Sequence, residues 1–95
     1  MCDLSGRTAL ISGAASGIGA ATAKAFAEAG ADVVLGWFPG DPHDVKPIRD
    51  AVVAAGRNAL VCELDVTSTE SVNAFADSAM STFGKIDILV ANAGI

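Results

Sequence analysis

Residues 12–19 form a glycine-rich run whose residue types and spacing suit the binding of a phosphate group. The run reads Ser-Gly-Ala-Ala-Ser-Gly-Ile-Gly, follows an apolar strand-like run and opens an alanine-rich helical run. Glycine lets the backbone turn tightly and lets a pyrophosphate approach, while the first turn of a helix offers unpaired N–H groups. The run therefore predicts a nucleotide phosphate site. The alternative is the tight strand-to-helix turn of any α/β protein.

The spacing of the glycines separates this run from related phosphate-binding patterns. Gly13, Gly17 and Gly19 stand as G-x-x-x-G-x-G. The dinucleotide fingerprint G-x-G-x-x-G is not met, and a P-loop needs a lysine directly after its last glycine, whereas the first lysine here is Lys24. The G-x-x-G-x-x-G pattern of nucleotide-sugar epimerases and dehydratases fails at Ser16. A methyltransferase fits poorly, because it expects an acidic residue at the end of the second strand.

Strand-like and helix-like segments alternate along the chain and would position this run. Apolar runs predict strands at 7–12, 32–37, 59–64 and 86–91. These runs are continuous, which is typical of parallel strands that are covered on both faces. We expect an α/β fold with a Rossmann-like, doubly wound parallel sheet. Only its N-terminal half would be present, with strand order 3-2-1-4.

Helical periodicity connects these strands. A helix is expected over 17–30, with Ile18, Ala21, Ala25 and Ala29 on the face toward the sheet. A second helix runs from Val45 to Ala55. A third follows a capping-box pattern at 67–70 and carries apolar residues at helical spacing from Val72 to Phe83. Glycines at 30, 56 and 84 would end the three helices.

Composition restricts the classes of partner. The 95 residues suit a single domain at most, and the apolar fraction of 52% implies surface that other parts of a protein would cover. A net charge of −5 with scattered basic residues argues against nucleic acid. No apolar run is long enough to cross a membrane, and the first residues do not resemble a secretory signal. Cys2 and Cys62 suggest neither a disulfide nor a metal pair, so a cytoplasmic location is expected.

Three motifs in order give the chain a family resemblance. Residues 12–19 are similar to T-G-x-x-x-G-I-G, with serine in place of threonine. Leu-Asp-Val-Thr follows the third strand at 64–67. Residues 84–94 are similar to G-x-I-D-x-L-V-N-N-A-G, with Ala91 for the first asparagine. The chain therefore resembles the N-terminal part of a short-chain dehydrogenase/reductase, in particular the 3-oxoacyl-carrier-protein reductase-like members, and the resemblance covers essentially all of it.

The resemblance implies a dinucleotide site along one edge of the sheet. The pyrophosphate and the adjoining ribose would lie at the glycine run, the adenine ribose at the end of the second strand, the adenine at the end of the third, and the nicotinamide-side ribose at the end of the fourth. The implied residues, in that order, are Gly13, Ala15, Ser16, Gly17, Ile18 and Gly19; Trp37 and Phe38; Asp65 and Val66; and Asn92, Ala93 and Gly94.

Alternatives stay open for several of these residues. Asp65 would accept a hydrogen bond from the adenine amino group, or else only cap the next helix. Asn92 would border the ribose, or else only end its strand. Asp87 is interpreted as structural rather than catalytic. His43, near Asp41 and Asp44, is interpreted as part of a solvated loop, so no metal site is expected.

The residues at the end of the second strand bear on the choice of coenzyme. NAD-specific relatives usually carry an acidic residue there, which bonds the ribose hydroxyls. Trp37 and Phe38 stand at that place, so the end of this strand has no carboxylate that would repel a 2′-phosphate. The resemblance therefore favours NADP. NAD remains the alternative, because no Arg or Lys stands at Ser16 or Phe38 to bind the phosphate.

The family's catalytic serine, tyrosine and lysine lie downstream of the last motif, and this chain contains no tyrosine. We assign no catalytic residue and expect residues 1–95 to form a partial NAD(P)-binding domain that is inactive alone. The full-length protein would be an oxidoreductase that transfers hydride between nicotinamide and a small carbonyl or alcohol substrate, as a dimer or tetramer of one chain. The alternatives are a dinucleotide-binding module without catalysis and a non-functional remnant.

Overall fold

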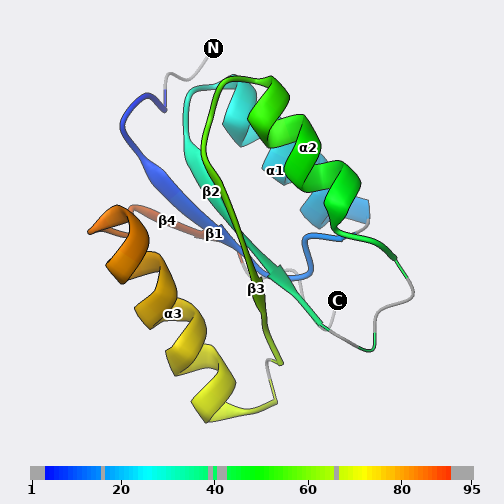
Figure 1. Cartoon of the computed structure of the whole chain (residues 1–95), viewed down its shortest axis with the longest axis vertical. Coiled ribbons are helices and arrows are strands. Elements are labelled where there is room, and N and C mark those ends of the chain that lie inside the picture. Colours follow the sequence, from blue (N-terminus) through cyan, green and yellow to red (C-terminus); the bar gives the residue numbers. More distant parts are fainter. Residues whose placement is uncertain (1–3, 16, 39, 41–42, 66, 91–95) are drawn as a thin grey trace.

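Strands and helices alternate strictly in the computed structural model, which describes residues 4–15, 17–38, 40, 43–65 and 67–90 (Figure 1). Each expected strand and helix is present. The bounds of the second strand are as predicted, and the other strands and helices are shorter by one or a few residues. The elements in chain order are β1 (Thr8–Ile11), α1 (Gly17–Glu28), β2 (Asp32–Trp37), α2 (Lys46–Ala54), β3 (Ala59–Glu63), α3 (Thr69–Phe83) and β4 (Ile88–Val90).

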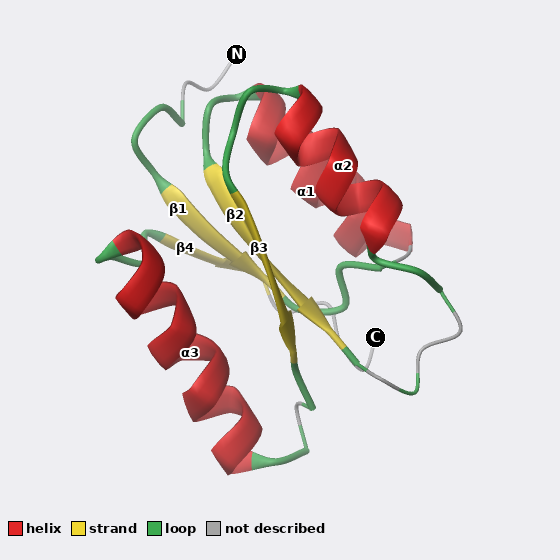
Figure 2. Cartoon of the chain, in the orientation of Figure 1, coloured by secondary structure: helices red, strands yellow, loops and turns green. Residues whose placement is uncertain are grey.

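The four described strands form one parallel sheet in the order β3-β2-β1-β4, which confirms the predicted order. In the central strand, Ile11 pairs with Leu35 of β2 on one side and with Val90 of β4 on the other. Helices α1 and α2 lie on one face of the sheet and α3 lies on the other (Figures 1 and 2). The layering is that of a Rossmann-like fold.

The core has two halves, one on each face of the sheet. Val33 and Leu35 of β2 point toward α1 and α2, whereas Val34 points toward α3, where it packs with Leu10 and Phe75. All five side chains are at most 4% exposed, so each stabilises the fold by about 1.5–3 kcal/mol. This two-sided burial explains why the strands read as continuous apolar runs.

The buried face of α1 differs from the predicted face. The prediction that Ile18, Ala21 and Ala25 face the sheet is wrong. Ile18 is 69% exposed, and the two alanines are exposed as well. The residues that are buried instead are Gly19, Ala23 and Ala27. These small residues recur every four positions, so they form a continuous flat stripe along which the helix approaches the sheet closely.

The start of α3 also differs from the expected capping box at 67–70. Ser68 is the N-cap, and its hydroxyl accepts a hydrogen bond of 3.3 Å from the backbone N–H of Ser71. Thr67 is therefore not the cap, and its hydroxyl is used elsewhere. At the other end, Gly84 ends the helix, as the sequence predicted. It adopts a left-handed conformation with φ of 76°, and its N–H donates to the Met80 carbonyl.

Asp87 joins the beginnings of β1 and β4. Its carboxylate accepts a bond of 2.9 Å from the N–H of Thr8, and its own N–H donates to the Thr8 carbonyl at 2.9 Å. Arg7 and Lys85 lie 3.5 Å from its two oxygens. The Thr8 N–H is the main cause that lowers the pKa of Asp87, and the two cations lower it further. This bonding fits the structural role expected of Asp87.

Part of the α3 side of the molecule is apolar and exposed. Leu89 pairs in register with Leu10, so it faces the α3 side of the sheet, yet it is 68% exposed. Val72 and Met80 of α3 are 41% and 47% exposed. Within the described part of the chain, no helix has the length and apolar character needed to cross a membrane.

Candidate functional site

The glycine run lies where β1 ends and is fastened to strands on both sides. The backbone N–H of Ser12 donates to the Val90 carbonyl of β4 at 3.0 Å. The N–H of Ala14 donates to the Gly36 carbonyl of β2 at 3.1 Å. The loop therefore sits at the point where β1 has β2 on one side and β4 on the other. In open α/β sheets, ligands bind outside the carboxyl ends of the strands at this kind of position.

Gly19 and Gly17 differ in the space around them: Gly19 is tightly packed, and Gly17 is open. A Cβ at Gly19 would overlap the carbonyl group of Gly13, so only glycine lets α1 start so close to the turn. Gly17, at the first position of α1, has φ of 57°, and no neighbouring atom would lie within 4 Å of a Cβ there. The space above Gly17 is open and borders the positive end of the α1 dipole. A pyrophosphate group fits such a cradle, which a side chain would fill.

The other predicted residues of the loop differ in exposure. The Ala15 methyl group is 5% exposed and belongs to the core, so only the backbone of Ala15 could face a ligand. Ile18, at the start of α1, is 69% exposed. Ser16 lies outside the described residues, as do Val66, Asn92, Ala93 and Gly94 of the predicted site.

The end of β2 carries the two predicted aromatic residues. Trp37 packs against the core beneath α1 and α2, and its indole N–H is buried without a hydrogen-bond partner in the described structure. Phe38 is 50% exposed, and its ring lies close to Gly40. Trp37 pairs in register with Glu63 of β3, whose side chain is exposed. A carboxylate is thus placed beside the end of β2, although β2 itself does not supply it.

Asp65 follows β3 at the same edge of the sheet, since the backbone N–H of Leu64 donates to the Trp37 carbonyl at 2.7 Å. Its Oδ1 accepts two bonds from Thr67, one of 2.6 Å from the hydroxyl and one of 2.9 Å from the backbone N–H. The hydroxyl bond is the main cause that lowers the pKa of Asp65. Because Ser68 caps α3, the alternative of Asp65 as the cap is wrong.

The structure thus brings together along one edge the glycine loop, the end of β2 and Asp65, which are distant in sequence. Thr67 and Ser71 are two further residues of this edge that the sequence interpretation did not assign to it; Ser71 accepts a bond of 2.8 Å from the Asp65 backbone N–H. The pattern Asp-x-Thr could have indicated Thr67, because an aspartate often bonds the residue two positions on.

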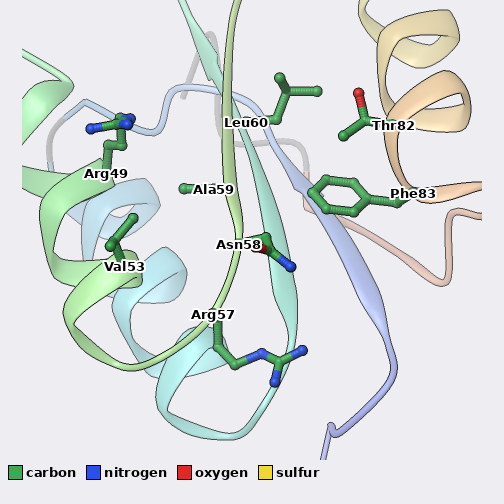
Figure 3. A pocket seen from close by; sticks show the side chains of 8 residues that line it. All are labelled: Arg49, Val53, Arg57, Asn58, Ala59, Leu60, Thr82 and Phe83. Atoms are coloured by element: carbon green, nitrogen blue, oxygen red, sulfur yellow. The ribbon is translucent and has the colours of Figure 1, made fainter.

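A separate cavity of about 490 Å³ lies at the start of β3, between α2 and the end of α3 (Figure 3). Two guanidinium groups line it, and each lies against a carboxylate: Arg57 is 2.9 Å from Asp32 and Arg49 is 3.4 Å from Asp50. None of the predicted site residues contributes. The lining residues are Arg49, Val53, Arg57, Asn58, Ala59, Leu60, Thr82 and Phe83.

Metal binding was not expected, and His43 was interpreted as part of a loop. Within residues 4–15, 17–38, 40, 43–65 and 67–90, no three His, Cys, Asp or Glu side chains group as metal ligands would. Asp41, which stands near His43 in sequence, lies outside the described residues.

Comparison with known proteins gives one consistent family. The family model described as short chain dehydrogenase matches residues 7–95. The cis-4-hydroxycyclohexanecarboxylate dehydrogenase of Sinomonas cyclohexanicum is 51% identical over 94% of this chain and 34% of its own length. The 7alpha-hydroxysteroid dehydrogenase of Escherichia coli strain K12 is 43% identical over 96% of this chain and 35% of its own length. The chain therefore spans about a third of the length of these curated relatives.

The solved structures that resemble this chain include dehydrogenases as well. Carveol dehydrogenase from Mycobacterium avium in complex with NAD superposes with a TM-score of 0.91 at 31% identity, over 100% of this chain and 38% of that one. A hydroxysteroid dehydrogenase from Escherichia coli gives a TM-score of 0.88 at 42% identity, over 98% of this chain and 39% of that one.

Proposed function

We propose that this chain, which belongs to the short-chain dehydrogenase family, forms the dinucleotide-binding part of an NAD(P)-dependent oxidoreductase. The observation that carries the proposal is the open cradle at Gly17, where the left-handed backbone, the empty space beside the Cα and the first N–H groups of α1 coincide. The dinucleotide would supply hydride-transfer chemistry toward a small carbonyl or alcohol substrate.

This chain's own residues would bind and orient the dinucleotide. The loop from Gly13 to Gly19 would hold the pyrophosphate by backbone N–H groups. Trp37 and Phe38 would border the adenine ribose, and Asp65 with Val66 the adenine. The segment Asn92-Ala93-Gly94 would border the nicotinamide-side ribose. These assignments rest on the motifs and, for the described residues, on their common position along one edge of the sheet.

NADP is the proposed coenzyme, since β2 ends in Trp37 and has no carboxylate at this end to repel a 2′-phosphate. The alternative is NAD. Two observations favour NAD. Glu63, which pairs in register with Trp37, has an exposed carboxylate, and the related carveol dehydrogenase was solved in complex with NAD. Affinities of the unmodified chain for NADP and for NAD separate the two. If Glu63 selects NAD, Glu63→Gln would raise affinity for NADP and lower affinity for NAD, because the carboxylate beside the adenine ribose is removed.

The activity, the cellular location and the oligomeric state are proposed from the resemblance to the family. The chain has no tyrosine, so hydride transfer would need residues that these 95 do not contain, and the chain alone is proposed to be inactive. The full-length protein would act in the cytoplasm as a dimer or tetramer. The second candidate function is a dinucleotide-binding module without catalysis, since the open cradle at Gly17 could bind a dinucleotide without any catalytic residue.

Binding of NADP and NAD to the 95-residue chain tests the proposal. Trp37 is the only tryptophan and lies at the proposed ribose site, so its fluorescence reports binding directly, and calorimetry provides an independent measurement. We expect saturable binding of both, with NADP tighter, and no turnover of alcohols or ketones. Absence of binding at up to about 1 mM, the upper end of ordinary Michaelis constants, would contradict the proposal.

A further inference from the structure

The carboxylate of Asp65 is held by one neighbouring residue through two hydrogen bonds. Both the hydroxyl and the backbone N–H of Thr67 donate to Oδ1, at 2.6 and 2.9 Å. Two donors on one oxygen fix the rotation of the carboxylate about its terminal bond. The second oxygen, Oδ2, has no hydrogen-bond partner among the residues that the structure describes. A fixed carboxylate with one oxygen available is suited to accept a bond from a ligand.

We propose that Thr67 is a positioning residue, which aims Oδ2 of Asp65 at the amino group of the adenine ring. This inference rests on the proposed function and assigns a part of the same site. Thr67 does not touch the dinucleotide in this scheme. The two donors of Thr67 occupy Oδ1 of Asp65, so Oδ2 remains available as an acceptor. A bond from the adenine amino group to Oδ2 would distinguish adenine from bases without an amino group.

The backbone beneath this carboxylate is held by the first turn of α3. The N–H of Asp65 donates to the Ser71 hydroxyl at 2.8 Å, and the N–H of Ser71 donates to the Ser68 hydroxyl. The loop is thereby tied to a helix of 15 residues, which is a more rigid support than a free loop. Thr67 fixes the side chain, and Ser71 fixes the main chain of the same residue.

Thr67 is not required for the helix itself. Ser68 supplies the N-cap of α3, and the N–H of Val72 bonds the Ser68 carbonyl at 3.1 Å. The Thr67 hydroxyl donates to Asp65 and to no other described residue. Its bond also lowers the pKa of Asp65, and an ionised carboxylate is a pure acceptor. Loss of the hydroxyl should therefore affect recognition of the base more than folding.

The experiment compares two dinucleotides in three variants. NADP and its hypoxanthine analogue differ in having an amino or an oxo group on the base. We expect the unmodified chain to bind the adenine form about tenfold more tightly, the effect of one hydrogen bond to a charged acceptor. Thr67→Val should reduce this preference to about threefold, because the backbone donor stays. Thr67→Ser should retain it, and Thr69→Val serves as the matched control at an exposed threonine of α3.

The outcomes separate this inference from the function on which it rests. If the unmodified chain binds neither dinucleotide, the proposed function fails and the role of Thr67 fails with it. If it binds both but shows no preference for adenine, or if Thr67→Val keeps the full preference, only the role of Thr67 is overturned. If thermal melting shows that Thr67→Val is unfolded, Thr67→Cys, with a weaker donor of similar size, provides the same comparison with the same two outcomes.

Discussion

Two glycines only two positions apart have different physical requirements in the candidate site. Gly19 is needed because a side chain would overlap the Gly13 carbonyl, so its role is to let α1 pack against the turn. Gly17 has open space around it and a left-handed backbone, so its role is to leave room. Substitution at Gly19 would damage the fold, and substitution at Gly17 would chiefly damage binding.

Gly17→Ala should weaken dinucleotide binding by about tenfold or more, because the new methyl group occupies the space that a pyrophosphate needs. The matched control is Gly56→Ala, since Gly56 also has a positive φ, 83°, and open space, but lies between α2 and β3. Both variants place an alanine at a positive φ, 57° at residue 17 and 83° at residue 56. Calorimetric titration with NADP checks the difference, and equal affinities of the two variants would contradict a phosphate site at Gly17.

At the scale of elements, β4 is the shortest of the described strands. It is held by the side chain of Asp87 as well as by its backbone hydrogen bonds to β1. β4 has three described residues, so it offers few backbone bonds to β1. Asp87 extends the pairing by accepting from the Thr8 N–H and donating to the Thr8 carbonyl. Since Ser12 of the glycine loop bonds the last residue of β4, the position of β4 bears on the candidate site.

Asp87→Asn should lower the melting temperature by a few degrees at pH 7. The pKa of Asp87 is lowered in the folded chain, so its stabilisation is complete above the ordinary aspartate value of about 3.9. This stabilisation is lost as pH falls through the lowered folded value. The difference between the two proteins should therefore shrink below about pH 4.

Thermal melting followed by circular dichroism between pH 3 and pH 7 measures this effect. The control is Asp50→Asn, because Asp50 forms only an exposed pair with Arg49 at 3.4 Å and such pairs contribute little. A melting difference for Asp87→Asn that stays constant over the whole pH range would show that its charge does not stabilise the strand.

The whole molecule covers its two faces unequally. Two helices pack on one face of the sheet and one helix on the other (Figure 2). On the side of the single helix, Leu89, Val72 and Met80 remain substantially exposed. The relatives that the chain matches are about three times as long. Exposed apolar surface of this kind promotes association in water. It is consistent with the high apolar fraction of the sequence.

Leu89→Thr should reduce self-association of the 95-residue chain, because it removes an apolar side chain that is 68% exposed and keeps a residue that favours strands. Val53→Thr, at a residue of α2 that is 51% exposed, is the control on the other side of the sheet. Sedimentation velocity over a range of concentrations gives the measurement. If both variants associate as the unmodified chain does, the α3 side does not drive the association.

The sequence by itself determined the features that depend on local pattern. Continuous apolar runs predicted parallel strands with two covered faces, the alternation with helices predicted the order 3-2-1-4, and the glycine run marked the turn between β1 and α1. The Asp65 position at the end of β3 followed from the same reasoning. These predictions succeeded because burial on both faces and tight turning each leave a direct record in residue type.

Only the tertiary structure decided the features that depend on which surfaces meet. The buried stripe of α1 is set by the contact of Gly19 with Gly13, and periodicity in a helix this rich in alanine cannot choose among its faces. The partners of Asp65 and Asp87 depend on how a loop and two strand ends come together, and Glu63 meets Trp37 only through the register of β2 and β3. A sequence specifies which groups can form bonds, but the pairing of distant groups is fixed only when the packed backbone brings them within reach.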